Sequence, residues 1–90
     1  MTFEWDAKKS KTNKEKHGID FEAGKALWLD ENRIEIGVAF PDEERWALIA
    51  MTQGKIWTAI YTRRDKTIRL ISVRRARAKE GKIYEEKTIG

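Results

Sequence analysis

The hydrophobic pattern changes character near residue 33, from helical patterning before it to strand-like alternation after it. The first part opens with "TFEWD" (residues 2–6), which predicts a short strand. Asp6 is a good helix N-cap, and residues 7–17 contain neither Pro nor Gly before Gly18. These residues are almost wholly polar, so we predict a surface helix over 7–17 that is held by few contacts.

A second helix is predicted over residues 21–29, with Asp20 as its N-cap. Unlike the first helix, it is largely apolar and must pack inward. The residues expected to do so are Phe21, Ala23, Ala26, Leu27 and Trp28.

The second part of the chain predicts four strands. Residues 33–40 alternate apolar side chains (Ile34, Ile36, Val38, Phe40) with polar or small ones, as in a half-buried strand. Three further strands are "RWALIAMT" (45–52), "IWTAIYT" (56–62) and "TIRLISV" (67–73). The short connections "QGK" and "RRDK" are typical of hairpins, so these strands should form an antiparallel meander.

A last helix is predicted from about Arg75 to Lys87, weakened by Gly81 by roughly 1 kcal/mol. The chain should therefore form one α+β domain over residues 1–90. We expect a single antiparallel sheet of about four strands plus a short N-terminal strand, with two N-terminal helices and a C-terminal helix. The last three strands are apolar on both faces, so some apolar surface should remain for another chain.

Composition excludes several classes of site. Cysteine is absent, which rules out disulfides, thiol nucleophiles and thiolate metal sites, and a single histidine disfavours zinc. We therefore expect neither a metal nor any other cofactor. No apolar run approaches the ~20 residues that span a bilayer, and the lysine-rich start does not look like a signal peptide. We expect a soluble cytoplasmic protein without a membrane partner.

The net charge of +4 hides a strong asymmetry. Residues 18–44 carry two basic residues against eight acids, whereas residues 45–90 carry twelve against four. Between Arg63 and Lys82 there are nine cations and two anions, a local charge of +7. Such a density favours a polyanionic partner such as RNA or DNA. The acidic middle is equally suited to a basic partner.

Six short motifs occur in a characteristic order: "FEWD" (3–6), "KHGIDF" (16–21), "DEERW" (42–46), "IYT" (60–62), "IRLISVRRA" (68–76) and "YEE" (84–86). Together they resemble the BrnT family of toxins from type II toxin–antitoxin systems. The resemblance covers residues 3–86, and the combination is specific although each motif alone is weak.

This resemblance implies a RelE-like ribonuclease fold, RNA cleavage that arrests translation, and neutralisation by a BrnA-like antitoxin. That antitoxin is a ribbon-helix-helix DNA-binding protein that dimerises and represses the shared operon. The implied assembly is a heterotetramer of two toxins and two antitoxins. Operator DNA would be contacted only through the antitoxin.

The residues themselves supply candidates for such chemistry. RNA carries its own nucleophile, the 2′-hydroxyl, so a metal-free ribonuclease needs a proton acceptor, cations for the phosphate and an acid for the leaving oxygen. The candidate catalytic residues are His17, Arg45, Arg69, Arg74 and Tyr84. The candidate RNA-binding residues are Lys9, Lys16, Arg75 and Arg77. No motif assigns the roles of base and acid among them.

Each candidate also has a structural alternative. His17 suits the C-terminal end of a helix, where the dipole favours a cation. Arg45 can pair with an acid of the preceding turn, and Arg69 with a carboxylate beside its strand. The other basic residues can form a solvated face, and Tyr84 can pack on the sheet.

Two other functions are alternatives to RNA cleavage, and the first of them also accounts for the charge pattern. A non-catalytic module that binds RNA or DNA needs the cations but no proton transfer. A structural subunit that binds only a protein partner needs neither.

Overall fold

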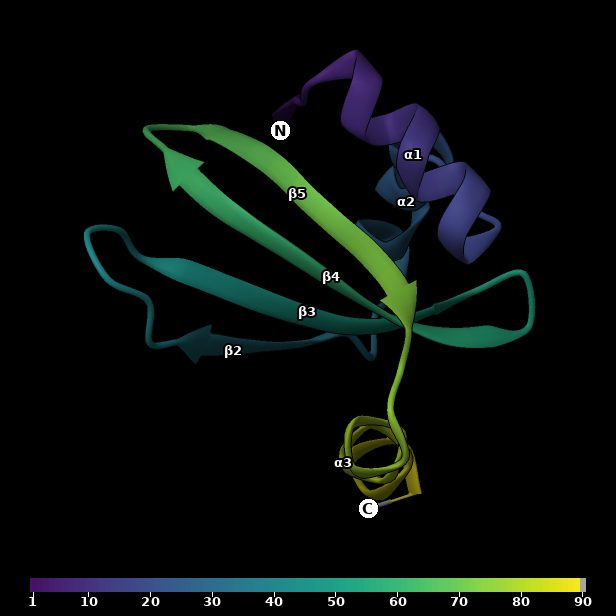
Figure 1. Ribbon diagram of the computed structural model, residues 1–90. Coiled ribbons are helices and arrows are strands. Elements are labelled where there is room, and N and C mark those ends of the chain that lie inside the picture. The colour runs from purple at the N-terminus through teal and green to yellow at the C-terminus, as the bar shows by residue number, and fades with distance from the viewer. Residues whose placement is uncertain (90) are drawn as a thin grey trace.

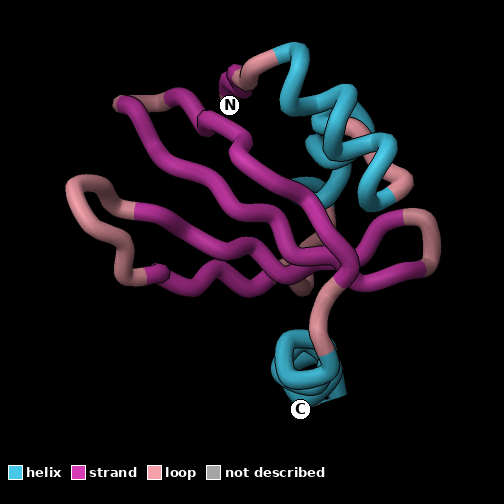
Figure 2. Tube along the Cα trace, in the orientation of Figure 1, coloured by secondary structure: helices cyan, strands magenta, loops and turns pink. Residues whose placement is uncertain are grey.

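The computed structural model describes residues 1–89. The elements are β1 (Thr2–Glu4), α1 (Ala7–His17), α2 (Phe21–Gly24), a 3₁₀ helix η1 (Lys25–Leu29), β2 (Ile34–Val38), β3 (Arg45–Thr52), β4 (Lys55–Arg64), β5 (Thr67–Arg75) and α3 (Ala78–Ile89). The strands form one sheet in the order β1-β5-β4-β3-β2 (Figures 1 and 2). The predicted α+β class is confirmed.

The helix α1 has the predicted bounds because both of its ends are specified locally. The Asp6 carboxylate accepts hydrogen bonds from the backbone N–H groups of Lys8 and Lys9, at 2.8 and 3.3 Å. At the other end Gly18 takes a left-handed conformation with φ of 79°. The second predicted helix is confirmed in its position. Only its first part is an α-helix, since α2 ends at Gly24 and the chain continues as the 3₁₀ helix η1. Such 3₁₀ turns are common at helix ends.

The sheet is mixed rather than purely antiparallel. Strands β2 to β5 form the predicted antiparallel meander. The strand β1, however, pairs with β5 in parallel, with Thr2 opposite Thr67 and Glu4 opposite Arg69. The pattern of β1 itself could not show this, because its direction is set by where the following helices return the chain to the sheet.

The last helix starts later than its sequence predicts. Arg74 and Arg75 still belong to β5, where they pair with Thr58 and Trp57 of β4. The helix begins at Ala78, after a turn in which the Glu80 carboxylate accepts a hydrogen bond from the Arg77 N–H at 2.8 Å. Pairing with β4 therefore extends the strand over residues that are also compatible with a helix.

The main core lies between the sheet and the helices α1, α2 and η1. Trp28 of η1 packs edge-on against Phe3 and Tyr61, with ring centroids 5.1 Å apart in both pairs. The other fully buried side chains of this core include Phe21, Leu27, Leu48, Leu70 and Val73. Figure 1 shows α1 and α2 together near β5, with α3 on the other side of the strands.

The polar helix α1 is held to the sheet by one buried side chain, that of Asn13. Its amide nitrogen donates to the carbonyl oxygens of Ile19 (2.8 Å) and Val73 (2.7 Å), and its amide oxygen accepts from the Val73 N–H (3.1 Å). Beyond β1, no strand of the described residues 1–89 pairs with the edge of β5, and Asn13 forms hydrogen bonds there instead. This contact positions the lysines of α1 beside β5.

The opposite face of the sheet, called the open face below, is covered at one end only. Near α3, Ile49 and Thr58 are 1% and 0% exposed. Towards the edge strand β2, Ile36 and Val38 each remain 38% exposed. None of the described helices is long and apolar enough to span a membrane.

Candidate functional site

Arg69, Ser72 and Arg74 of β5 lie on the open face. They pair with Thr62, Ile60 and Thr58, which are successive alternate residues of β4 and therefore point the same way. A β-bulge opposite the Ile60–Tyr61 step makes this possible by inserting Ile71 as an extra residue. Simple alternation places Ile71 and Val73 on the face of Arg69. That prediction is wrong for Val73, which belongs to the main core.

A hollow of about 270 Å³ lies between α1 and β5, and we call it the basic groove. Its lining residues are Lys8, Lys9, Thr12, Asn13, Lys16, His17, Ile71 and Ser72. The groove thus brings together Lys9, Lys16 and His17, three of the predicted site residues, although they come from a helix that the sequence marks only as a surface element. Cations and an imidazole around one hollow can bind phosphate and transfer protons.

Ser72 was not among the predicted site residues. Its only signal in the sequence is a small polar residue between the apolar residues Ile71 and Val73. The bulge at Ile71 aligns it with Arg69 and Arg74 on one face and places it at the wall of the basic groove. Bulges are often found where a strand re-aims a side chain beside a functional site.

Arg69 pairs with Glu4 of β1 across the parallel strand pair, at 2.7 Å. The two side chains are 34% and 39% exposed, so water screens the ion pair and its contribution to stability is small. A phosphate group can therefore compete with Glu4 for this guanidinium. The predicted structural alternative for Arg69 is present, and it leaves a phosphate role open.

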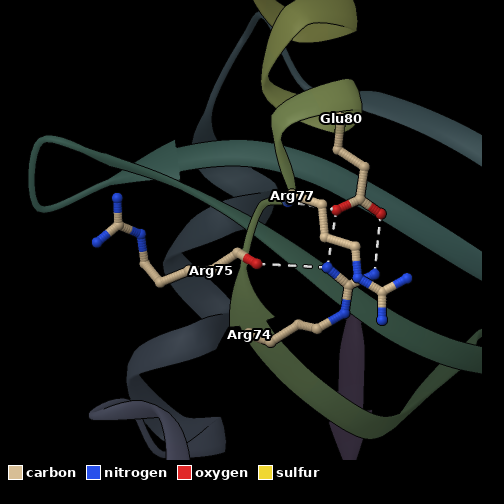
Figure 3. A network of polar contacts seen from close by, with 4 residues as sticks. All are labelled: Arg74, Arg75, Arg77 and Glu80. Atoms are coloured by element: carbon tan, nitrogen blue, oxygen red, sulfur yellow. Dashed lines mark hydrogen bonds and ion pairs between the residues drawn. The ribbon is translucent and has the colours of Figure 1, made fainter.

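Arg74 makes a much tighter pair with Glu80 of α3. Its two terminal nitrogens donate to the two carboxylate oxygens at 2.7 and 2.9 Å, and the side chains are only 19% and 22% exposed (Figure 3). The Arg74 guanidinium, followed by the Arg77 N–H, lowers the pKa of Glu80 to about 2. Hydrogen bonding to Glu80 also raises the pKa of Arg74. This bidentate pair joins β5 to α3 and uses the charge of Arg74 within the protein.

Replacing Glu80 by glutamine should lower the free energy of unfolding by about 2 kcal/mol at pH 7, because Arg74 then loses its ionised partner. The folded-state pKa of Glu80 is depressed, so its stabilisation is present above about pH 4.5 and is lost as the pH falls towards 2. Denaturant titrations at pH 7 and pH 2.5 should show the difference between the two proteins shrinking.

The matched control is Glu43→Gln, which removes an exposed carboxylate that pairs with Arg45 at 2.8 Å. We expect that change to cost below about 0.5 kcal/mol. Equal effects of the two substitutions would contradict the structural role of the Arg74–Glu80 pair.

Arg75 and Arg77 lie between Arg74 and Glu80 in the sequence. Figure 3 shows the Arg75 side chain directed away from that of Arg74. The Arg75 guanidinium lies 5.6 Å from the Trp57 ring centroid, on the face that carries the main core. Both Arg75 and Arg77 are exposed, and neither lines the basic groove.

Arg45 and Tyr84 border the open face without reaching the groove. Arg45 pairs with Glu43 at 2.8 Å and stacks over the Phe40 ring, 3.5 Å from its centroid. Tyr84 is 5% exposed, and its hydroxyl donates to Asp30 at 2.6 Å. Burial, followed by this hydrogen bond, raises the pKa of Tyr84 to about 12. Such a phenol is a poor proton donor near neutral pH. The observed contacts of both residues are structural ones.

A larger hollow of about 510 Å³ lies at the other end of the main core. Its cations Arg33, Arg63 and Lys66 are matched by the acids Glu31, Glu35 and Asp65. Glu35 also accepts hydrogen bonds from Arg63 and from the Tyr61 hydroxyl. The side-chain charges in this hollow balance, whereas the lining of the basic groove contains basic residues and no acid, so the groove is the better site for phosphate.

Comparison with known families agrees with the resemblance carried by the motifs. Residues 5–80 match the family described as "Ribonuclease toxin, BrnT, of type II toxin-antitoxin system". No curated protein matches the chain.

Proposed function

The chain belongs to the BrnT family of ribonuclease toxins of type II toxin–antitoxin systems, and from this premise we propose that it cleaves RNA in the basic groove without a metal ion. The reaction is attack of a ribose 2′-hydroxyl on the adjacent phosphate. It yields a 2′,3′-cyclic phosphate on one fragment and a 5′-hydroxyl on the other.

One observation carries the assignment of the groove: His17 lines the same hollow as Lys9, Lys16 and Ser72. The two lysines neutralise backbone phosphates, and the Ser72 hydroxyl can donate a hydrogen bond to a phosphate oxygen. His17 is the group of this set that can both accept and donate a proton, so we assign it the proton transfer.

We assign the stabilisation of the reacting phosphate to Arg69, which does not itself line the basic groove. It lies on the same face as Ser72, three residues away along a bulged strand. When Arg69 leaves the half-exposed Glu4 and binds a phosphate, it loses one charge-assisted hydrogen bond and gains another. Preorganised positive charge at the developing negative charge is often the largest single catalytic contribution.

The remaining predicted residues lie outside the basic groove. We assign Arg74 to holding α3 on the sheet through Glu80, and Arg75 and Arg77 to RNA contacts outside the groove. A catalytic part for Arg45, Arg74 or Tyr84 stays a prediction from the sequence.

Incubation of the purified chain with RNA in excess EDTA tests the proposal. We expect fragments with 5′-hydroxyl and cyclic-phosphate ends. The matched substrate carries a single 2′-deoxyribose at the cleaved position and should resist cleavage there. RNA left intact both with and without ribosomes would contradict the proposal. If the chain still binds that RNA, a non-catalytic binding module explains the data better.

As a type II toxin the chain has an antitoxin partner. We propose that this partner is a ribbon-helix-helix protein of the BrnA type, acting in the cytoplasm, with two toxins flanking an antitoxin dimer whose DNA-binding arms stay free. Neutralisation follows if the antitoxin covers the basic groove and the neighbouring arginines Arg69, Arg74 and Arg75. Substrate phosphates cannot then reach them.

A further inference from the structure

The strand β2 (Ile34–Val38) is an unprotected edge of the sheet. It lies at the end of the strand order, and among the described strands it pairs only with β3. Its one charged residue, Glu35, is engaged by Tyr61 and Arg63. Natural proteins usually guard such edges with charges or proline, because the free N–H and C=O groups are a template for another strand.

Apolar side chains continue along this edge. Ile36 and Val38 are each 38% exposed, and Phe40 beyond them is 46% exposed. A hollow of about 420 Å³ follows at the end of β2, lined in part by Val38, Phe40 and Trp46. The buried indole N–H of Trp46 has no hydrogen-bond acceptor among the described residues. The edge therefore offers apolar contacts, and β2 offers backbone groups.

The charge beside this edge is opposite to that of the basic groove. Residues 30–44 contain six acids and one arginine. Three of the acids, Glu31, Asp42 and Glu44, are exposed and form no ion pair with any described residue. An RNA backbone is repelled from such a surface, whereas a protein segment with basic side chains is attracted.

From these observations we infer that β2 is the docking edge for the antitoxin. A segment of the antitoxin adds a strand beside β2, with alternate apolar residues over Ile36 and Val38 and basic residues near Asp42 and Glu44. Main-chain hydrogen bonds supply affinity in this mode, and the alternate side chains supply specificity. The inference rests on the proposed function only for the identity of the partner.

An antitoxin that docks at β2 can also cover the basic groove, which lies beside β5, three strands away in the same sheet. Three strand spacings separate β2 from β5, roughly 14 Å in all. An extended chain covers that distance in about four or five residues. A segment anchored on β2 can therefore cross the open face and reach Ser72 and Arg69.

The test compares two variants that add positive charge at exposed apolar positions. The double variant Ile36→Lys, Val38→Lys changes the docking edge, and Leu29→Lys changes a residue that is 83% exposed elsewhere. Affinity for the product of the neighbouring antitoxin gene is measured by calorimetry, with circular dichroism to verify folding. We expect the double variant to bind roughly 30-fold more weakly and the control to bind like the wild type.

Amide hydrogen exchange of the unmodified chain gives an independent readout. Antitoxin binding should slow exchange in residues 34–38 by about tenfold or more, as expected for newly paired backbone groups. Unchanged affinity of the double variant, or protection confined to other segments, overturns the inference. The inference is also overturned if the chain forms a dimer without antitoxin and the double variant abolishes that dimer. The β2 edge would then bind a second copy of this chain.

The nuclease assay separates this inference from the proposed function. The double variant should cleave RNA like the wild type and should arrest growth even when the antitoxin is coexpressed. A wild-type chain that leaves RNA intact while the antitoxin protects β2 would remove the proposed chemistry and leave the docking edge in place.

Discussion

Replacing Asn13 by leucine is expected to lower the free energy of unfolding by about 3–5 kcal/mol. Leucine has nearly the same size, so the change mainly removes three hydrogen bonds, to the Val73 N–H and to the carbonyls of Val73 and Ile19. Val73 and Ile19 are 0% and 1% exposed, so water does not readily replace the lost partner. Guanidinium titration of both proteins measures the difference.

A loss of this size is a large part of the stability of a small domain, typically about 5–13 kcal/mol for a chain of this length. The control is Asn32→Leu, at an exposed position, which should change the free energy of unfolding by less than about 0.5 kcal/mol. If Asn13→Leu cost below about 1 kcal/mol, Asn13 would not be the contact that holds α1 on the sheet.

Replacing His17 by asparagine is expected to reduce the rate of RNA cleavage by about 10²–10⁴-fold, the usual contribution of a positioned acid or base. The fold should survive, because His17 is half-buried at the last turn of α1, where a cation typically contributes below about 1 kcal/mol. Single-turnover rates at saturating RNA measure the chemical step, and melting curves verify the fold.

Two substitutions on the same helix serve as controls. Lys11→Gln removes a charge outside the groove and should change neither rate nor affinity beyond about twofold. Lys16→Gln should weaken RNA binding and reduce the slope of log affinity against log salt by roughly 0.7, while retaining the rate at saturation. A His17 variant that keeps the wild-type rate would assign that histidine to the end of the helix alone.

Local signals in the sequence determined much of the secondary structure. The bounds of α1 follow from Asp6 and Gly18, because a cap acts only on residues within one helical turn. The bounds of β3 follow from its apolar run between two turns. The motif order also indicates the BrnT family, which residues 5–80 match.

The location of the candidate site was decided by long-range contacts. Nothing near Asn13 in the sequence marks it as a partner of Val73, sixty residues away, yet this contact places the lysines and His17 of α1 beside β5. The bulge at Ile71 arises from the register between β4 and β5, and it decides which side chains join Arg69.

The tertiary structure also decided the partners of the charges. The sequence predicts that Arg69 pairs with a carboxylate or a phosphate, and that Arg74 either binds phosphate or belongs to a solvated face. It does not show that Glu4 from the first strand and Glu80 from the last helix are their partners. The parallel pairing of β1 and the start of α3 at Ala78 were likewise decided by contacts between distant segments. Caps and hydrophobic periods are set by neighbours within a few residues, whereas register, ion pairing and strand direction depend on which distant segments bury their surfaces together.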